Sequence, residues 1–188
     1  MLAPIFVLVG CGAAPDYYLL PAQSPTAMRS LAPSQSVVVT DFNLPSYAQA
    51  VEIPSLQHNG VLALDRDANW ADEPRRAVTR HFSEALALRL GSLVATDPWP
   101  AYSQEPVYRV EVAVDQFIGT LGGTVSLRGQ YFILRAREGT ISASDRFQID
   151  VPTSDVSYVA FVAAHSRALE ILADRIASRI SGRALPTS

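Results

Sequence analysis

The clearest strand pattern in the chain is "VYRVEVAVDQFI", residues 107–118. Val110, Val112 and Val114 alternate with polar or small residues, which is the period of a strand with one buried face. The glycine-rich segment "GTLGGT", residues 119–124, follows directly and is typical of a turn between two strands. The sequence therefore predicts that this strand pairs with the next one in an antiparallel hairpin.

Other strands extend this hairpin in both directions along the chain. "TVSLRGQYFILRAR", residues 124–137, and "ISASDRFQIDV", residues 141–151, also alternate, so three strands are expected to form an antiparallel meander. The valine run at residues 37–39 predicts a strand that is buried on both faces. Two short strands are expected around residues 50–53 and 61–64.

Apolar residues recur at helical spacing in two segments, which predicts two amphipathic helices. The first helix is expected to begin near Asn69 or Asp72, and its apolar stripe extends to Leu93. The second helix is expected over residues 155–181, with Gly182 ending it. The predicted fold class is therefore α+β, with two helices packed on one face of a mainly antiparallel sheet.

The composition excludes several classes of function. All 15 basic residues of the 188-residue chain are arginines, so phosphate-binding loops and Schiff-base chemistry that depend on lysine are excluded. The net charge is -3 and no basic stripe is present, which argues against a nucleic-acid partner. The length fits one domain, and a hydrophobic content of 48% is typical of a folded chain.

Cys11 is the only cysteine of the chain, and it follows a short apolar run. The run from Leu2 to Gly10 is too short to span a bilayer, but it fits the apolar part of a secretory signal. The residues Leu8–Cys11, "LVGC", resemble the bacterial lipobox, in which a small residue precedes a cysteine that receives a diacylglyceryl group. We therefore expect residues 1–10 to be removed as a signal peptide and Cys11 to carry the lipid. A plain apolar N-terminus is the alternative, because no basic residue precedes the run.

The region after the cysteine divides into a tether and a domain. Residues 11–35 are rich in proline and poor in charge, which is typical of an extended, flexible tether. Within this region "DYYLL", residues 16–20, is too apolar for a plain linker, and we expect it to dock on the domain as a short edge strand. The domain is expected over residues 36–183, followed by a tail at 184–188. Gly12 is not the aspartate that usually retains lipoproteins in the inner membrane, which favours the periplasmic face of the outer membrane.

The sequence predicts neither a catalytic residue nor a metal or cofactor site. "DRDAN", residues 65–69, has the first ligands of a calcium loop, but Trp70 stands where that loop needs glycine. His58, His81 and His165 are the only histidines, and no two of them have the spacing of a metal-binding motif. These residues are therefore expected to be structural.

Three aromatic residues are candidates for contact with a partner: Trp70, Phe117 and Phe132. Trp70 is expected at the start of the first helix, where it covers the core or, alternatively, faces a partner. Phe117, Phe132 and Leu134 fall by alternation on the strand face opposite to the predicted core. A strand that is apolar on both faces is either covered by another element or exposes an interaction surface.

Four features in a fixed order resemble the PqiC (YmbA) type of lipoproteins, which are auxiliary lipoprotein components of ABC-type transport. The lipobox is followed by "PDYYLLP" at residues 15–21 and "SVVVTDFNLPSYA" at residues 36–48. The first helix region reads "NWADEPRRAVTRHFSEALALRL" at residues 69–90, and the last helix contains "SRAL" at residues 166–169. Residues 50–70 match the family pattern poorly. The resemblance covers nearly the whole chain.

The resemblance implies a lipid-anchored adaptor rather than an enzyme. Such proteins are outer-membrane partners of MCE-domain systems, which move lipids across the periplasm of Gram-negative bacteria. The expected partners are the membrane, through the lipid on Cys11, and an MCE-domain protein. MCE proteins form rings, so several copies of this chain could form a matching ring. The alternative function is a periplasmic carrier that holds an acyl chain itself, which needs an apolar cavity on the order of several hundred Å³.

Overall fold

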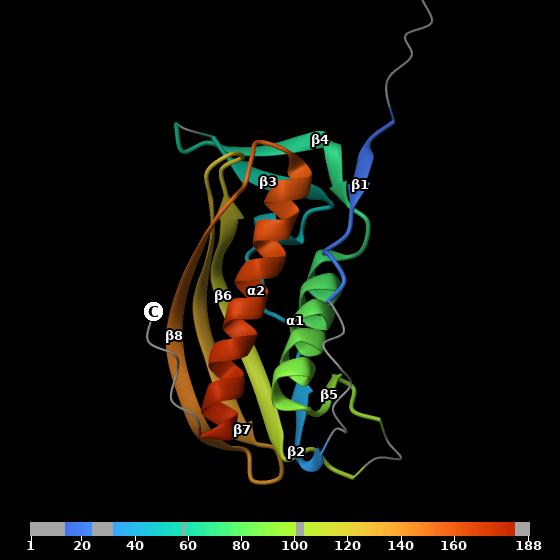
Figure 1. Ribbon diagram of the computed structural model, residues 1–188, viewed down its shortest axis with the longest axis vertical. Helices are drawn as coiled ribbons and strands as arrows, with labels where there is room; N and C mark the ends of the chain where they lie inside the picture. Colours follow the sequence, from blue (N-terminus) through green and yellow to red (C-terminus); the bar gives the residue numbers. More distant parts are fainter. Residues whose placement is uncertain (1–13, 24–31, 58, 101–103, 183–188) are drawn as a thin grey trace, which may run out of the picture.

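The computed structural model describes residues 14–23, 32–57, 59–100 and 104–182 of the chain. A large sheet is covered on one face by two helices, and a small sheet lies at one end of the molecule (Figure 1). This arrangement confirms the α+β class. The elements are β1 (Asp16–Tyr18), β2 (Ala32–Val39), the 3-10 helix η1 (Ser46–Gln49), β3 (Glu52–Leu56), β4 (Leu62–Trp70), α1 (Pro74–Leu90), β5 (Ser92–Thr96), β6 (Tyr108–Gly119), β7 (Thr124–Arg135), β8 (Thr140–Pro152) and α2 (Tyr158–Ser181).

The large sheet has the strand order β5-β2-β6-β7-β8. Strands β6, β7 and β8 are antiparallel neighbours, as the sequence predicts. Strand β2 runs parallel to both β5 and β6, so the sheet is mixed rather than purely antiparallel. The chain passes through the small sheet and α1 between β2 and β5, and parallel neighbours need such a crossover. The valines at residues 37–39 of β2 are fully buried, which confirms the prediction for that run.

Strand β5 is an element that the sequence pattern did not separate from the first helix. The prediction that the helix extends to Leu93 is wrong, because Gly91 ends α1 in the left-handed conformation with φ of 61°. The chain then enters β5 at Ser92 and pairs with β2. The apolar residues after the glycine continued the helical spacing by coincidence, so periodicity alone could not mark the boundary.

The two helices form the second layer and lie over one face of the large sheet (Figure 1). Their buried apolar residues share one core with those of the sheet. Phe82 and Leu86 of α1 and Phe161 and Leu172 of α2 are fully buried in one core with the inward-facing strand residues. Helix α2 begins at Tyr158, three residues later than predicted, and it ends at Gly182 as expected. The core therefore fills the space between the two layers.

The small sheet has the strand order β1-β4-β3 and lies across the end of the molecule where α2 begins (Figure 1). Strand β1 runs parallel to β4, and β3 and β4 form an antiparallel hairpin. The prediction that "DYYLL" contributes a short edge strand is confirmed by β1. Strand β4 extends to residue 70, well beyond the short strand expected around residues 61–64.

Candidate functional site

Trp70 is the last residue of β4, and its side chain is turned into the core with 9% exposure. The prediction that Trp70 opens the first helix is wrong. Glu73 caps α1, because its carboxylate accepts hydrogen bonds from the backbone N–H groups of Arg75 and Arg76 at 3.2 and 2.7 Å. Pro74 takes the first helical position, where no backbone N–H is needed. The strand therefore ends at the tryptophan, and the helix begins four residues later.

A bulge in β6 decides the position of Phe117. Between Val114 and Gln116, strand β6 contains one residue more than its partner β7, namely Asp115. Because strand side chains alternate, the extra residue turns Phe117 to the face that the helices cover, where it is buried. The prediction that Phe117 lies on the face opposite to the core is therefore wrong. Simple alternation could not reveal the bulge.

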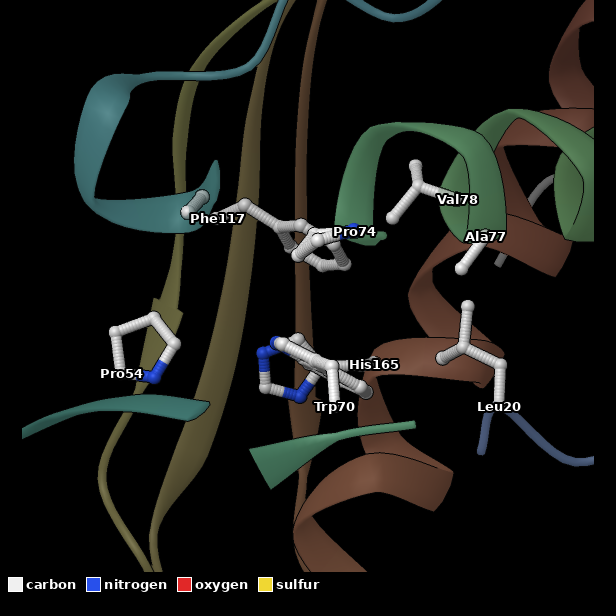
Figure 2. Close-up of a pocket in the computed structure, with 9 residues that line it drawn as sticks. Leu20, Pro54, Trp70, Pro74, Ala77, Val78, Phe117 and His165 are labelled. Atoms are coloured by element: carbon white, nitrogen blue, oxygen red, sulfur yellow. The ribbon is translucent and has the colours of Figure 1, made fainter. Parts of the chain in front are cut away.

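Trp70, Phe117 and His165 meet in a narrow apolar pocket under the small sheet (Figure 2). The ring centroids of Trp70 and Phe117 lie 5.9 and 4.7 Å from that of His165. Leu20, from the N-terminal segment, closes the pocket on one side (Figure 2). Its free volume is about 10 Å³, which is on the order of the space for one water molecule. The side chains around this pocket are thus closely packed, and an acyl chain does not fit between them.

His165 is a neutral histidine in this apolar surrounding. Its Nδ1 lies 2.8 Å from the backbone carbonyl oxygen of Phe161 and donates the hydrogen bond. Burial lowers the pKa of His165 to about 4, and the hydrogen bond to the carbonyl opposes this shift. The ring lies within contact distance of three aromatic residues and has no carboxylate partner, so the histidine serves packing, as the sequence suggested.

The N-terminal segment, residues 14–23, packs against both the small sheet and the helices. The backbone carbonyl of Tyr18 accepts a hydrogen bond from the N–H of Ala71 at 2.9 Å. The ring of Tyr18 lies 5.7 Å from the ring of Tyr158 at the start of α2. The described part of the segment therefore belongs to the packed structure, although the sequence placed the domain boundary at residue 36.

A buried polar cluster joins this segment to both helices. Nε2 of His81 in α1 lies 2.9 Å from Oγ of Ser166 in α2 and 2.8 Å from Nε2 of Gln23. Gln23 also donates a hydrogen bond to Glu170 at 3.3 Å. Burial lowers the pKa of His81, and the nearby carboxylate of Glu170 opposes this shift. No sequence pattern indicates this cluster, because its members are far apart along the chain.

A serine next to a histidine raises the question of nucleophilic catalysis. Such a pair needs a third group on the other ring nitrogen and access to substrate. Glu170 instead lies 3.5 Å from the hydroxyl of Ser166, and both Ser166 and His81 are buried between the helices. The cluster therefore has the geometry of a structural link rather than of a catalytic triad.

Phe132 has the position that alternation predicted. Its neighbours in β7, Tyr131 and Ile133, are buried under the helices, so Phe132 faces the opposite side of the sheet, where it is partly exposed. Leu134 and Ile141 lie on the same outer face, as a cross-strand pair between β7 and β8. A partner role of Phe132 stays a prediction.

Cys11 and His58 lie outside the described residues. Among the residues that the structure does describe, no group of three or more acidic, histidine or cysteine side chains could hold a metal ion. Within the same residues, no helix combines the length and the hydropathy that a bilayer-crossing helix needs.

The comparison with protein families gives a match over most of the chain. The model of the family described as "ABC-type transport auxiliary lipoprotein component" matches residues 17–177, from β1 into the last part of α2. The chain belongs to this family. The sequence resemblance is thereby confirmed, and the family is one of transport auxiliary lipoproteins rather than a known enzyme family.

Solved structures share the fold. The crystal structure of an uncharacterized protein has a TM-score of 0.73 at 17% identity and covers 89% of this chain and 99% of its own. A protein from Xanthomonas campestris has a TM-score of 0.63 at 17% identity, covering 90% and 94%. A hypothetical protein from Chlamydia trachomatis has a TM-score of 0.53 at 10% identity, covering 80% and 100%. A search of curated proteins found no match.

Proposed function

We propose that this protein is the outer-membrane-anchored adaptor of an MCE-type ABC system that moves lipids across the periplasm. The observation that carries the proposal is the family match over residues 17–177, together with the lipobox at Leu8–Cys11. The family supplies the general role in ABC-type transport. The MCE partner and the outer membrane are the finer parts of the proposal.

Anchoring is assigned to Cys11. A single acyl chain binds a membrane only marginally, whereas a diacylglyceryl thioether with a further acyl group on the new N-terminus gives stable attachment. The absence of aspartate at residue 12 supports the outer membrane as the destination. The N-terminal segment reaches the domain at Asp16, so only a few residues separate the lipid from packed structure.

The packed interior favours an adaptor over a lipid carrier. The narrow pocket around His165 holds about 10 Å³, far below the volume of roughly 300 Å³ or more that small-molecule sites have. The layer between sheet and helices is filled by large apolar side chains such as Phe82, Phe161 and Leu172, which are fully buried. The alternative function, a carrier that encloses an acyl chain between the sheet and the helices, therefore has no support from this packed layer.

The outer face of the large sheet is the surface proposed for the MCE partner. Phe132, Leu134 and Ile141 form an apolar group there, away from the helices. Trp70 and Phe117 are parts of the core and would act on a partner only by supporting this fold. Phe132 is therefore the candidate residue that can touch a partner directly.

A co-purification experiment tests the function. The full-length protein, expressed from its own locus in the Gram-negative host, should co-purify with the MCE-domain protein encoded nearby. Phe132→Ser should weaken this association, whereas Leu88→Ser, which changes an exposed apolar residue of α1 on the helix layer, should leave it unchanged. Absence of any association, with an unchanged outer-membrane lipid composition after deletion of the gene, would contradict the proposal.

A further inference from the structure

Exposed apolar side chains gather at one end of the molecule. Among the described residues eleven large apolar side chains are exposed, and eight of them belong to the small sheet, to its flanking residues or to the start of α2. The remaining three are scattered over α1, β5 and β8. Six of the eight define the hairpin-end surface: Tyr17, Val61, Leu62, Leu64, Val156 and Val159.

The exposure of these side chains is large. Val156 and Tyr17 are 74% and 64% exposed, and Leu64 is 47% exposed. An open hollow of about 720 Å³ lies between the β3–β4 hairpin and the turn that joins β6 to β7, with Leu64 and Tyr158 in its wall. A hydrogen bond of 3.1 Å from the hydroxyl of Tyr158 to Asp65 fixes this wall. An apolar surface of this kind marks an interaction site in a folded protein.

The path of the chain indicates what this surface meets. Strand β1 begins at the same end of the molecule as the β3–β4 hairpin (Figure 1). Residue 16 is five residues after residue 11, and five fully extended residues span at most about 18 Å. If Cys11 carries the lipid, as in the proposed function on which this inference rests, this end of the domain stays within that distance of the membrane.

The charges at this end do not attract an anionic membrane. Asp16, Asp67 and Asp155 lie in β1, in β4 and just before α2, and Arg66 in β4 is a basic residue among them. Attraction between basic residues and anionic lipids is therefore not the source of binding. The lipid anchor would supply the affinity for the membrane. The exposed surface itself combines aliphatic side chains with a tyrosine, and tyrosine is enriched at the interfacial region of a bilayer.

We propose that the hairpin-end surface rests on the headgroup region of the membrane in which Cys11 is anchored. Contact through this end sets the domain with α2 pointing away from the bilayer, because α2 begins at this surface (Figure 1). The end of the domain where β7 turns into β8 then projects into the periplasm.

Two single-cysteine labels test the orientation. The thiol of Cys11 is blocked when it is lipidated, so a cysteine introduced by Leu64→Cys or Ile141→Cys is the only thiol that a fluorophore can label. The lipidated full-length proteins are reconstituted into phosphatidylethanolamine–phosphatidylglycerol vesicles that contain lipids brominated near the headgroup. Both positions are exposed apolar residues, at 47% and 61%, so they form a matched pair.

The label at residue 64 should be quenched about twofold or more by the brominated lipids, because it lies at the interface, and the label at residue 141 should be unaffected. Equal quenching of the two labels on vesicle-bound, lipidated protein would overturn the orientation and leave the anchor intact. Shielding of the residue 64 label in the soluble Cys11→Ala background without vesicles would also overturn it, in favour of a second copy as the occupant. An unmodified Cys11, seen by mass spectrometry, would instead contradict the proposed anchor.

Discussion

The two sheets of this protein differ in how far their apolar side chains are buried. In the large sheet, most apolar side chains of β6, β7 and β8 point into a core that two helices close. In the small sheet, the core-facing residues Tyr18 and Trp70 are packed, while Tyr17, Leu62 and Leu64 remain in solvent. The difference indicates that the helix-covered face of the large sheet supplies stability, whereas the small sheet presents an exposed apolar surface at the end of the molecule.

The largest expected effect is on the free energy of unfolding, and it should distinguish a buried from an exposed residue of α2. Phe161 is fully buried in α2, whereas Val159, two residues earlier, is 69% exposed. Phe161→Ala should lower the free energy of unfolding by about 3–5 kcal/mol through lost burial and a cavity. Val159→Ala should change it by no more than about 0.5 kcal/mol. Urea unfolding of the soluble Cys11→Ala protein measures both, and similar losses would remove the distinction between core and surface.

Acid should weaken the packed end through His165. Below its ordinary pKa of about 6.5 the unfolded chain protonates this histidine, whereas the folded state resists protonation until about pH 4. The contribution of His165 to the free energy of unfolding is therefore fully present above about pH 6.5. It is lost as the pH drops toward 4, by up to about 3 kcal/mol.

The control for this prediction is His165→Phe, because carboxylates with lowered pKa values, such as that of Asp150, also contribute to acid lability. Between pH 6.5 and 4, the variant should lose less stability than the unmodified protein. Parallel stability curves for the two proteins would show that His165 does not titrate in this way.

A glycine in the neighbouring strand, Gly129, pairs with Val114 directly beside the bulge that turns Phe117 inward. A Cβ at Gly129 would collide with the backbone carbonyl of Ala113 and would touch the ring of Phe147. Gly129→Ala should therefore destabilise the protein by about 1–3 kcal/mol. Gln130→Ala, the adjacent residue on the outer face, is the control and should have little effect in the same thermal unfolding measurement.

The smallest effect concerns the docked N-terminal segment. Gln23→Ala removes the amide that bridges His81 and Glu170, which should cost about 1 kcal/mol or less in local stability. Hydrogen exchange of the Ala71 amide, which donates to Tyr18, reports this docking and should become faster. Gln57→Ala, in the hairpin, should leave the exchange rate unchanged, and an unaltered rate in Gln23→Ala would show that the bridge does not hold the segment.

The sequence was most informative where patterns are local. Alternation in β6–β8, the valine run of β2 and the glycine after α2 predicted those elements, because each depends on side-chain direction or backbone conformation within a few residues. The order of motifs also predicted the family. The parallel pairing of β2 was not predictable, since it depends on segments that are distant in the chain.

The candidate site was less predictable than the fold. The sequence could not place Phe117, because one extra residue in β6 reverses the alternation after Val114. The contact between His81 and Ser166 joins two helices, and no spacing rule connects such residues. For the β3–β4 hairpin, the sequence predicted a short apolar strand but not that its side chains are exposed. Exposure depends on whether another element covers the strand, and a local pattern does not contain that information.

Neutron reflectometry on a supported bilayer tests the membrane-facing role of the small sheet most directly. The lipidated full-length protein is anchored through Cys11, and the protein density is measured along the membrane normal. We predict protein density that begins within the headgroup layer, with no water between the headgroups and the domain. A water layer about 10 Å thick or more, which the short anchor segment would still permit, would contradict contact between the hairpin-end surface and the membrane.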